Sequence, residues 1–148
     1  LVTRTFSKIY GMAGMRVGYA ITSEENARRI FGHLMSFGGN ISGIAAAIAS
    51  YDDIGFLDRS RAMVLEGRAM IMDAVATSGL TALPSQTNFV YVEVPDADAV
   101  QNAMKARGIA IRGAYGDWTR WSRVSTGKLE DVSRYAAALP EIIDTLRG

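Results

Sequence analysis

LVTRTFSKIYGMAGMRVGYA, residues 1–20, is the stretch that decides the fold of this chain. It contains one lysine, Lys8, with hydroxyl residues at Thr5 and Ser7 just before it and a single arginine, Arg16, in the second half of the loop that follows. Apolar residues flank this set on both sides, in the pattern of short strands. We therefore expect a strand, a lysine-bearing loop and a second strand.

The residue types in this loop suit one kind of chemistry. A lysine that follows an apolar strand is expected to be partly shielded from water, which favours the neutral amine that attacks an aldehyde. The hydroxyl groups of Thr5 and Ser7 and the guanidinium of Arg16 are donors suited to a dianionic phosphate. Two glycines between the lysine and the arginine let the backbone pass close to a bulky group. An amine for an aldehyde and donors for a phosphate together describe a site for pyridoxal 5'-phosphate (PLP).

The strings TFSK at residues 5–8 and GMAGMRVGY at residues 11–19 resemble the lysine segment of fold-type I PLP-dependent aminotransferases. They are most similar to the class I/II branch, which includes the histidinol-phosphate aminotransferases. The resemblance implies covalent binding of PLP at Lys8, with the cofactor phosphate held by Thr5, Ser7 and Arg16. A nucleotide-binding alternative is not supported, because the chain contains no Gly-x-x-x-x-Gly-Lys-[Ser/Thr] string.

The same resemblance covers essentially the whole chain and implies its fold class, α/β. Residues 1–53 are expected to be the end of a PLP-binding large domain. Residues 54–148 are expected to be an α+β small domain that includes a long bridging helix. Family members carry more than half of their length before the equivalent of Leu1, so we expect this chain to be a C-terminal fragment. The aspartate and the aromatic residue that contact the cofactor ring in the family would then lie upstream.

Composition and charge exclude several other classes of protein. Of 148 residues, 49% are hydrophobic and 21% are charged, which is typical of a globular protein. The net charge of +1 gives no reason to expect binding to nucleic acid or to an anionic membrane. The chain has no cysteine and only one histidine, His33, so it has no disulfide and no site of several histidines for a metal. No apolar run approaches the roughly 20 residues of a membrane span, and we expect a cytoplasmic protein.

Hydrophobic spacing predicts the remaining elements. Helices are expected from the cap at Ser23 to about Phe37, over residues 43–50, from about Phe56 to Ser78, and over residues 97–107 and 128–147. Strands are expected over residues 1–7, 15–22, 87–94, 109–112 and 121–126. Pro140 is a possible kink in the last helix. The second half of the chain is therefore expected to be a compact α+β unit with a small, largely antiparallel sheet.

A second cluster of candidate residues lies on the strands near the C-terminus. Arg112 and Arg123 each lie within an apolar strand, where an arginine is costly to bury unless it meets an anion. The resemblance implies that Arg123 grips the anionic end of the substrate, that Arg112 assists, and that Asn88 lies near the site. An exposed edge-strand position for Arg112 and a strand-start hydrogen bond for Asn88 are alternative explanations. The loop between the two arginines carries tryptophans that depart from the family pattern, so a preference for phosphate stays open.

The resemblance implies transamination in the intact protein. The substrate would be an amino acid or an amino-alcohol phosphate, namely histidinol phosphate with 2-oxoglutarate as acceptor, and the enzyme would be a homodimer. A PLP-dependent lyase or decarboxylase, such as a threonine-phosphate decarboxylase, would show the same lysine and arginine. A third possibility is a non-catalytic fragment or dimerisation module, because half of the site would be missing from this chain.

Overall fold

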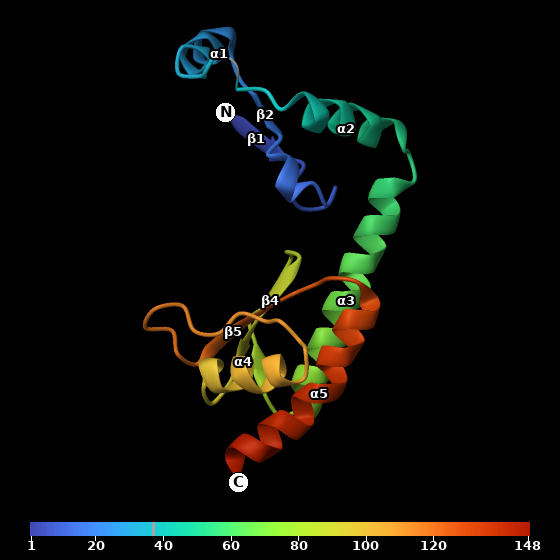
Figure 1. The fold of residues 1–148 in the computed structure, drawn as a ribbon, viewed down its shortest axis with the longest axis vertical. Coiled ribbons are helices and arrows are strands. Elements are labelled where there is room, and N and C mark those ends of the chain that lie inside the picture. The colour runs from blue at the N-terminus through green and yellow to red at the C-terminus, as the bar shows by residue number, and fades with distance from the viewer. Residues whose placement is uncertain (37) are drawn as a thin grey trace. The chain divides into compact units, whose positions relative to one another are not determined.

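A computed structural model describes residues 1–36 and 38–148 (Figure 1). The chain divides into two compact units, Leu1–Arg61 (unit 1) and Ala62–Gly148 (unit 2). The boundary between them falls inside helix α3 (Phe56–Thr77). The domain boundary expected after residue 53 stays a prediction, and each unit is described by itself below.

Unit 1 begins with a two-stranded antiparallel ribbon. Strand β1 (Val2–Thr5) pairs with β2 (Gly18–Ile21), from Val2 opposite Ile21 to Thr5 opposite Gly18. Gly18 is required at this position, because a Cβ atom there would lie 2.7 Å from the carbonyl oxygen of Arg4. All residues of both strands are exposed. The ribbon therefore forms the two strands and the loop expected from residues 1–20.

Two capped helices complete unit 1 before α3 begins. Helix α1 (Glu24–Phe31) begins after Ser23, whose hydroxyl accepts a hydrogen bond from the backbone N–H of Asn26 at 3.4 Å. Helix α2 (Ile41–Asp52) begins after Asn40, whose side-chain oxygen accepts from the N–H of Gly43 at 3.2 Å. Both caps satisfy backbone donors that the helix itself leaves free.

Helix α1 is shorter than its sequence predicts. The expected end near Phe37 lies outside the described residues, and the helix ends at Phe31. Beyond it, the N–H groups of His33 and Leu34 donate to the carbonyls of Ile30 and Phe31, three residues back. This tighter turn begins at Gly32, a residue type that disfavours continued α-helix.

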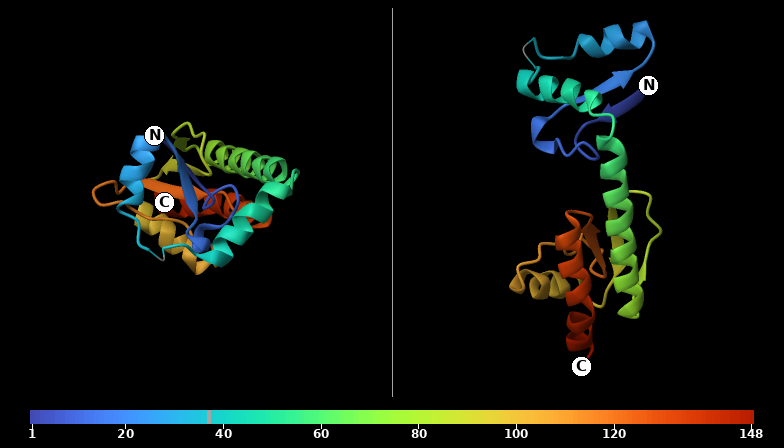
Figure 2. Two further views of the ribbon diagram at one scale, coloured as in Figure 1. Left: turned by 90° about the horizontal axis from the view of Figure 1, so that it is seen from above. Right: turned by 90° about the vertical axis from the view of Figure 1, so that its right-hand side faces the viewer.

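Unit 2 is built around a three-stranded antiparallel sheet with the order β3-β4-β5. Its strands are β3 (Thr81–Ala82), β4 (Phe89–Glu93) and β5 (Trp121–Ser125). Its helices are the C-terminal part of α3, then α4 (Ala97–Ala106) and α5 (Leu129–Arg147). Figure 2 shows α3 and α5 running side by side in this unit. The small antiparallel sheet predicted for this half of the chain is confirmed.

The hydrophobic core of unit 2 lies between one face of this sheet and the three helices. Val90, Val92 and Val124 are buried on that face, while alternate residues such as Tyr91 and Arg123 belong to the opposite face. The helices contribute the rest of the buried cluster, which includes Ile71, Val75, Val100, Met104, Leu139, Ile142 and Ile143. The sheet therefore has one face packed in the core and one face free to carry a site.

Two details of unit 2 differ from the prediction. The strand expected over residues 109–112 forms only an isolated bridge between Arg112 and Arg123. The short strand β3 was not predicted, because two residues are too few for an alternating pattern.

Helix α5 continues through Pro140 without a break. Among the described residues, no helix combines the length and apolar character that crossing a membrane requires.

Candidate functional site

The Lys8 loop is fixed to the ribbon by backbone hydrogen bonds. The N–H of Phe6 donates to the carbonyl of Val17 at 3.1 Å, and the N–H of Met12 donates to the carbonyl of Phe6 at 3.0 Å. The carbonyl of Lys8 itself accepts from the N–H of Gly11 at 2.8 Å. Gly11 has a φ of +67°, a conformation that suits glycine, so the turn after Lys8 depends on this residue type.

Aromatic side chains pack against one another at the Lys8 loop. Phe6 is only 3% exposed, and its ring lies 4.9 Å from that of Tyr10 and 5.4 Å from that of Tyr51 in α2. The ring of Tyr10 stacks on Phe56 at the start of α3, with 6.0 Å between centroids. Phe6 and Tyr10, on either side of the segment 7–9 that contains Lys8, are therefore held by neighbouring helices of unit 1, which limits the positions open to Lys8.

Tyr19 and Tyr51 form a hydrogen-bonded pair beside this aromatic cluster. The hydroxyl of Tyr51 donates to that of Tyr19 at 3.1 Å. This hydrogen bond, with lesser contributions from burial and from neighbouring tyrosines, raises the pKa of Tyr51 to about 12. The pair links α2 to β2.

All three predicted phosphate-binding residues line one cavity of unit 1. The cavity has a volume of about 600 Å³, and its lining includes Thr5, Ser7 and Arg16. Thr5 and Ser7 are also joined directly, because the N–H of Ser7 donates to the hydroxyl oxygen of Thr5 at 3.0 Å. The apolar part of the wall comes from β2, α1 and the residues next to them, including Val17, Ala20, Ile30, Phe31 and Leu34. The structure thus brings the predicted donors together in a hollow of suitable size for a small anionic group.

Lys8 follows Ser7 directly but does not itself line this cavity. Its side chain is exposed, so the shielding predicted from the apolar strand is wrong for this chain. Strand β1, which leads to Lys8, is likewise exposed along its whole length. Among the described residues, the Lys8 amine forms no ion pair, so no carboxylate of the chain competes for it.

Arg16 has an unusual backbone conformation. Its φ of 54° and ψ of 47° place it in the left-handed region, and it is the only non-glycine residue of the described chain with a positive φ. Such a conformation costs about 1–2 kcal/mol for an L-residue and is often retained at functional positions. One guanidinium nitrogen donates to the carbonyl of Ala13 at 2.7 Å, and the group forms no ion pair with a described residue. Its remaining N–H groups are free for an anion.

Helix α2 fixes the segment that leads to Arg16. The side-chain amide of Asn40 donates to the carbonyl of Met15 at 3.0 Å. The Cα of Gly43 is packed so closely that an added Cβ would lie 2.6 Å from Val17 and 2.9 Å from the Met15 carbonyl. The residues on both sides of Arg16 are therefore held against the N-terminus of the helix.

In unit 2, the structure brings Arg112 and Arg123 together. The N–H of Arg112 donates to the carbonyl of Arg123 at 3.1 Å. Both guanidinium groups lie near the ring of Tyr115, at 4.3 Å for Arg112 and 5.9 Å for Arg123, and Arg123 also lies 5.4 Å from the ring of Phe89. Neither arginine forms an ion pair with a described residue. The Nε atom of Arg123 is buried without a hydrogen-bond partner. Arg112 and Arg123 therefore offer N–H donors that an anion could satisfy.

Two hydrogen bonds to its backbone carbonyl hold Asn88 in place. Its carbonyl accepts from the N–H of Thr126 at 2.9 Å and from the hydroxyl of Thr126 at 3.0 Å. These bonds fix the start of β4 to the end of β5 and account for the strand-start role considered for this residue. A contact of the Asn88 side chain with substrate stays a prediction.

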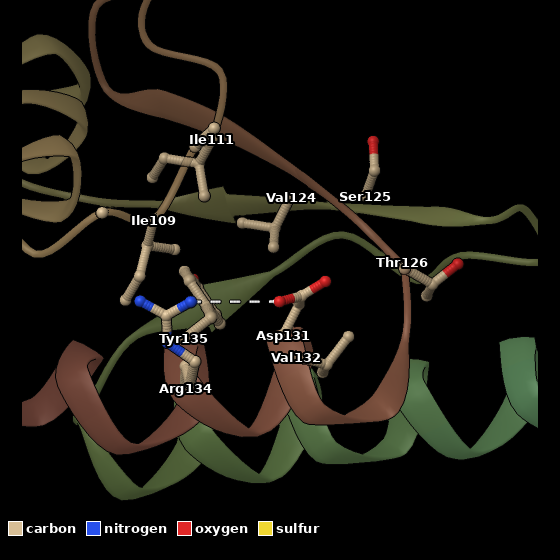
Figure 3. A pocket seen from close by; sticks show the side chains of 12 residues that line it. Ile109, Ile111, Val124, Ser125, Thr126, Asp131, Val132, Arg134 and Tyr135 are labelled. Atoms are coloured by element: carbon tan, nitrogen blue, oxygen red, sulfur yellow. Dashed lines mark ion pairs between the residues drawn. The ribbon is translucent and has the colours of Figure 1, made fainter.

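A further cavity of about 380 Å³ contains none of the predicted site residues. It opens between residues 108–111, residues 124–127 and the first turns of α5 (Figure 3). Asp131 and Arg134 form a loose ion pair at its mouth, with 4.0 Å between their charged atoms. Tyr135 is 3% exposed, and burial raises the pKa of its hydroxyl. No group of three or more possible metal-ligating side chains occurs in the part of the chain that the structure describes.

Tyr115 is the residue of this region that sequence reasoning missed. It lies between two arginines that are eleven residues apart in the chain, and only the folded loop shows that they share its ring. The signal available in the sequence was the density of aromatic residues in the segment 113–121. From the sequence alone, the tryptophans of this segment indicate a departure from the family pattern rather than a site.

Comparison with known proteins adds independent findings. Residues 1–139 match the family model described as aminotransferase class I and II. The chain is 36% identical to histidinol-phosphate aminotransferase 1 of Thiobacillus denitrificans, over 100% of this chain and 39% of that protein. It is 41% identical to histidinol-phosphate aminotransferase 2 of Ralstonia nicotianae, over 94% of this chain and 38% of that protein. The crystal structure of histidinol-phosphate aminotransferase from Sinorhizobium meliloti, in complex with PLP, is similar with a TM-score of 0.85 and 37% identity, over 97% of this chain and 41% of that one. The chain thus spans about two fifths of the length of these relatives.

Proposed function

Because this chain belongs to the aminotransferase class I and II family, we propose that it acts as the lysine-bearing part of a PLP-dependent aminotransferase. The observation that carries the proposal is the joint placement of Thr5, Ser7 and Arg16 in the wall of one cavity, directly beside Lys8. Relatives named histidinol-phosphate aminotransferase support histidinol phosphate as the amino donor. The acceptor proposed with it is 2-oxoglutarate.

The residues of unit 1 fit the cofactor in their chemistry. Lys8 supplies an amine for the cofactor aldehyde, and no carboxylate of the described chain is paired with it. Thr5, Ser7 and Arg16 would hold the phosphate by hydrogen bonds and by the charge of the guanidinium. When bound, PLP supplies an electron sink that stabilises negative charge at the substrate Cα.

The chain's own residues would then bind, orient and transfer a proton. The Lys8 amine would be the base that takes the proton from the substrate Cα and holds it for return. Arg123, with Arg112 beside it, would bind the anionic end of the substrate through its unpaired N–H groups. Asn88 is proposed as a further substrate-binding residue. Fixing the anionic end of the substrate orients the C–H bond that must break.

The assembly and location of the protein also belong to this proposal. We propose a cytoplasmic homodimer. What supports the dimer is the surface of α2, where Ile41, Ile44 and Ile48 are exposed although they are large and apolar. Sedimentation of the chain at several concentrations tests this point, and a chain that stays monomeric throughout would contradict a dimer built on α2.

Covalent trapping tests the cofactor site directly. The purified chain is mixed with PLP, reduced with borohydride to fix the cofactor on the amine it has bound, digested and mapped by mass spectrometry. The chain has three lysines, so Lys105 and Lys128 serve as internal controls. We expect label on Lys8 in excess over the other two, and an absorbance band near the visible edge that Lys8→Ala removes and Lys105→Ala retains. Equal labelling of all three lysines would overturn the proposed site.

Product analysis distinguishes transamination from the decarboxylase alternative. The intact enzyme is given 2-oxoglutarate with histidinol phosphate in one reaction and with an amino-acid phosphate in another, because histidinol phosphate has no carboxylate to lose. Glutamate and carbon dioxide are measured in both. An aminotransferase converts the 2-oxo acid to glutamate, whereas a decarboxylase acting on an amino-acid phosphate releases carbon dioxide and leaves 2-oxoglutarate unchanged. Release of carbon dioxide without glutamate would contradict the proposal.

A further inference from the structure

An aromatic cavity lies on the free face of the unit 2 sheet. Its volume is about 520 Å³, and it is lined by Leu83, Tyr91, Tyr115, Gly116, Trp118 and Trp121. Two of these, Tyr91 and Trp121, belong to β4 and β5 on the face opposite the core. The other aromatic walls come from the loop between Arg112 and β5, which carries the tryptophans that depart from the family pattern. The lining residues are almost all apolar or aromatic, so the cavity suits a flat apolar group.

The loop that forms this cavity is held in place at both ends. At its start, the N–H of Ala114 donates to the Asp98 carboxylate at 2.9 Å. At its centre, the N–H of Trp118 donates to the carbonyl of Tyr115 at 3.0 Å. At its end, the carbonyl of Thr119 accepts from the N–H of Ala97 at 2.8 Å. The cavity therefore exists without a ligand, and binding would not need to order the loop first.

The unpaired arginines lie against the wall of this cavity. Tyr115 lines the cavity and also contacts the guanidinium of Arg112 at 4.3 Å. Tyr91 lines it and is the direct cross-strand partner of Arg123. A buried Nε of Arg123 without a partner is a donor that an anion would satisfy. Tyr115 and Tyr91 thus connect the apolar cavity to two arginines that have no anionic partner among the described residues.

We propose that this cavity binds an apolar aromatic ring of phenyl or indole size, in a ligand whose carboxylate or phosphate pairs with Arg123 and Arg112. The ring contacts Trp118, Trp121 and Tyr91, and a chain of a few bonds reaches from it to the guanidinium groups. Its identification as a substrate, an aromatic amino acid or 2-oxo acid in place of histidinol phosphate, rests on the proposed aminotransferase function. The binding site itself does not, because every residue that forms it lies in unit 2.

Tryptophan fluorescence gives a site-specific test. Trp118 and Trp121 are the only two tryptophans of the chain, and both line the cavity. The 148-residue chain is titrated with 3-phenylpropionate, and dissociation constants are confirmed by calorimetry. We expect 3-phenylpropionate to bind at least about tenfold more tightly than propionate, which lacks the ring, or than benzyl alcohol, which lacks the charge. 2-Phenylethyl phosphate in place of the carboxylate shows which anion is preferred, and either anion agrees with the site.

Three outcomes overturn the proposal. Equal binding of propionate or inorganic phosphate would mean an anion site without a ring site. Equal binding of benzyl alcohol would mean an apolar hollow without a role for the arginines. Equal binding of 3-(imidazol-4-yl)propionate would overturn the preference for an apolar ring and would agree with histidinol phosphate as the ligand of these arginines.

Variants assign the binding to the named residues. Arg123→Met should raise the dissociation constant of 3-phenylpropionate by roughly ten- to a hundredfold, because a hydrogen-bonded charge is lost. Arg123→Lys should recover only part of this, since lysine lacks the planar fork of N–H groups. Arg107→Met is the matched control: Arg107 pairs with Glu141 and does not line the cavity, so binding should be unchanged. Circular dichroism confirms that each variant is folded, and an Arg123→Met chain that is folded and binds normally would overturn the proposal.

The outcome is independent of the cofactor experiment. Labelling of Lys8 by PLP concerns unit 1 and needs no aromatic ligand. If Lys8 is labelled but 3-phenylpropionate does not bind, the aromatic site is wrong and the aminotransferase proposal stands. If 3-phenylpropionate binds but Lys8 is not labelled, the site stands as a binding site and its identification with a substrate is lost.

Discussion

The hydroxyl of Tyr51 donates a hydrogen bond to the hydroxyl of Tyr19, with 3.1 Å between the two oxygens. This bond joins the last turn of α2 to β2, and it stabilises the neutral form of Tyr51. It is therefore a measurable report on whether α2 is packed against the segment that carries Arg16.

Tyr19→Phe should lower the pKa of Tyr51 from about 12 toward its ordinary value near 10. A pKa that is higher in the folded chain means that the bond contributes its full stability below about pH 10 and loses it as pH rises toward about 12. Ultraviolet absorbance of tyrosinate during a pH titration measures the shift. Tyr91→Phe, in unit 2, is the control and should leave the titration of Tyr51 unchanged. An unaltered titration in Tyr19→Phe would contradict the assigned hydrogen bond.

Gly43→Ala should destabilise unit 1. The added Cβ would lie 2.6 Å from Val17 and 2.9 Å from the Met15 carbonyl, so the helix or the strand must move. Overpacking of this kind costs about 1–3 kcal/mol of free energy of unfolding. Urea denaturation followed by circular dichroism measures the loss. Gly14→Ala, where no atom lies within 4 Å of the new Cβ, should be close to neutral.

Thr5→Val should weaken PLP binding while leaving the ribbon folded. The substitution keeps the β-branched shape but removes the hydroxyl that accepts from the N–H of Ser7 at 3.0 Å. It also removes a proposed donor to the phosphate, so the affinity should fall by roughly tenfold. Equilibrium titration with PLP measures the change. Thr5→Ser retains the hydroxyl and should recover most of the affinity; if it behaves like Thr5→Val, the hydroxyl is not the cause.

Asp96→Ala should destabilise unit 2 by about 1 kcal/mol, within the 0.5–2 kcal/mol typical of a lost helix cap. One carboxylate oxygen of Asp96 accepts from the N–H groups of Asp98 and Ala99, at 2.9 and 2.8 Å. Because both tryptophans lie in unit 2, their fluorescence during urea denaturation reports its stability. Asp117→Ala is the control, since Asp117 is exposed in the loop and forms no ion pair with a described residue. Equal losses in both variants would indicate a general charge effect rather than a cap.

Local sequence signals predicted most elements because their causes are local. The cap at Ser23 and the hydrophobic spacing that predicted the helices and strands depend on residues within one or two turns of the chain. The partial failure of the strand at 109–112 has a different origin. Strand propensity does not decide pairing, and only Arg112 of that segment pairs with β5.

The candidate site was predictable in its residue types but not in its environment. The grouping of Thr5, Ser7 and Arg16 follows from their positions on a ribbon and its loop. The exposure of Lys8 does not follow from sequence, because shielding depends on what covers the outer faces of β1 and β2. The shared contact of Arg112 and Arg123 with Tyr115 depends on how one loop folds back, which a strand pattern does not encode.

The position of the hydrophobic core has a consequence for how the chain opens. The buried cluster runs from Ile71 to Ile143 and lies wholly in unit 2, whereas Phe6 and Ala47 are the only buried hydrophobic side chains among the described residues of unit 1. Amide hydrogens exchange with solvent at a rate set by local opening, which is slow in a packed core and fast where few apolar contacts resist it. In deuterated water, the amides of β4 and α5 should therefore retain hydrogen long after those of β1 and α1 have exchanged it for deuterium. The lysine-bearing loop thus belongs to the half of the chain that is first to open.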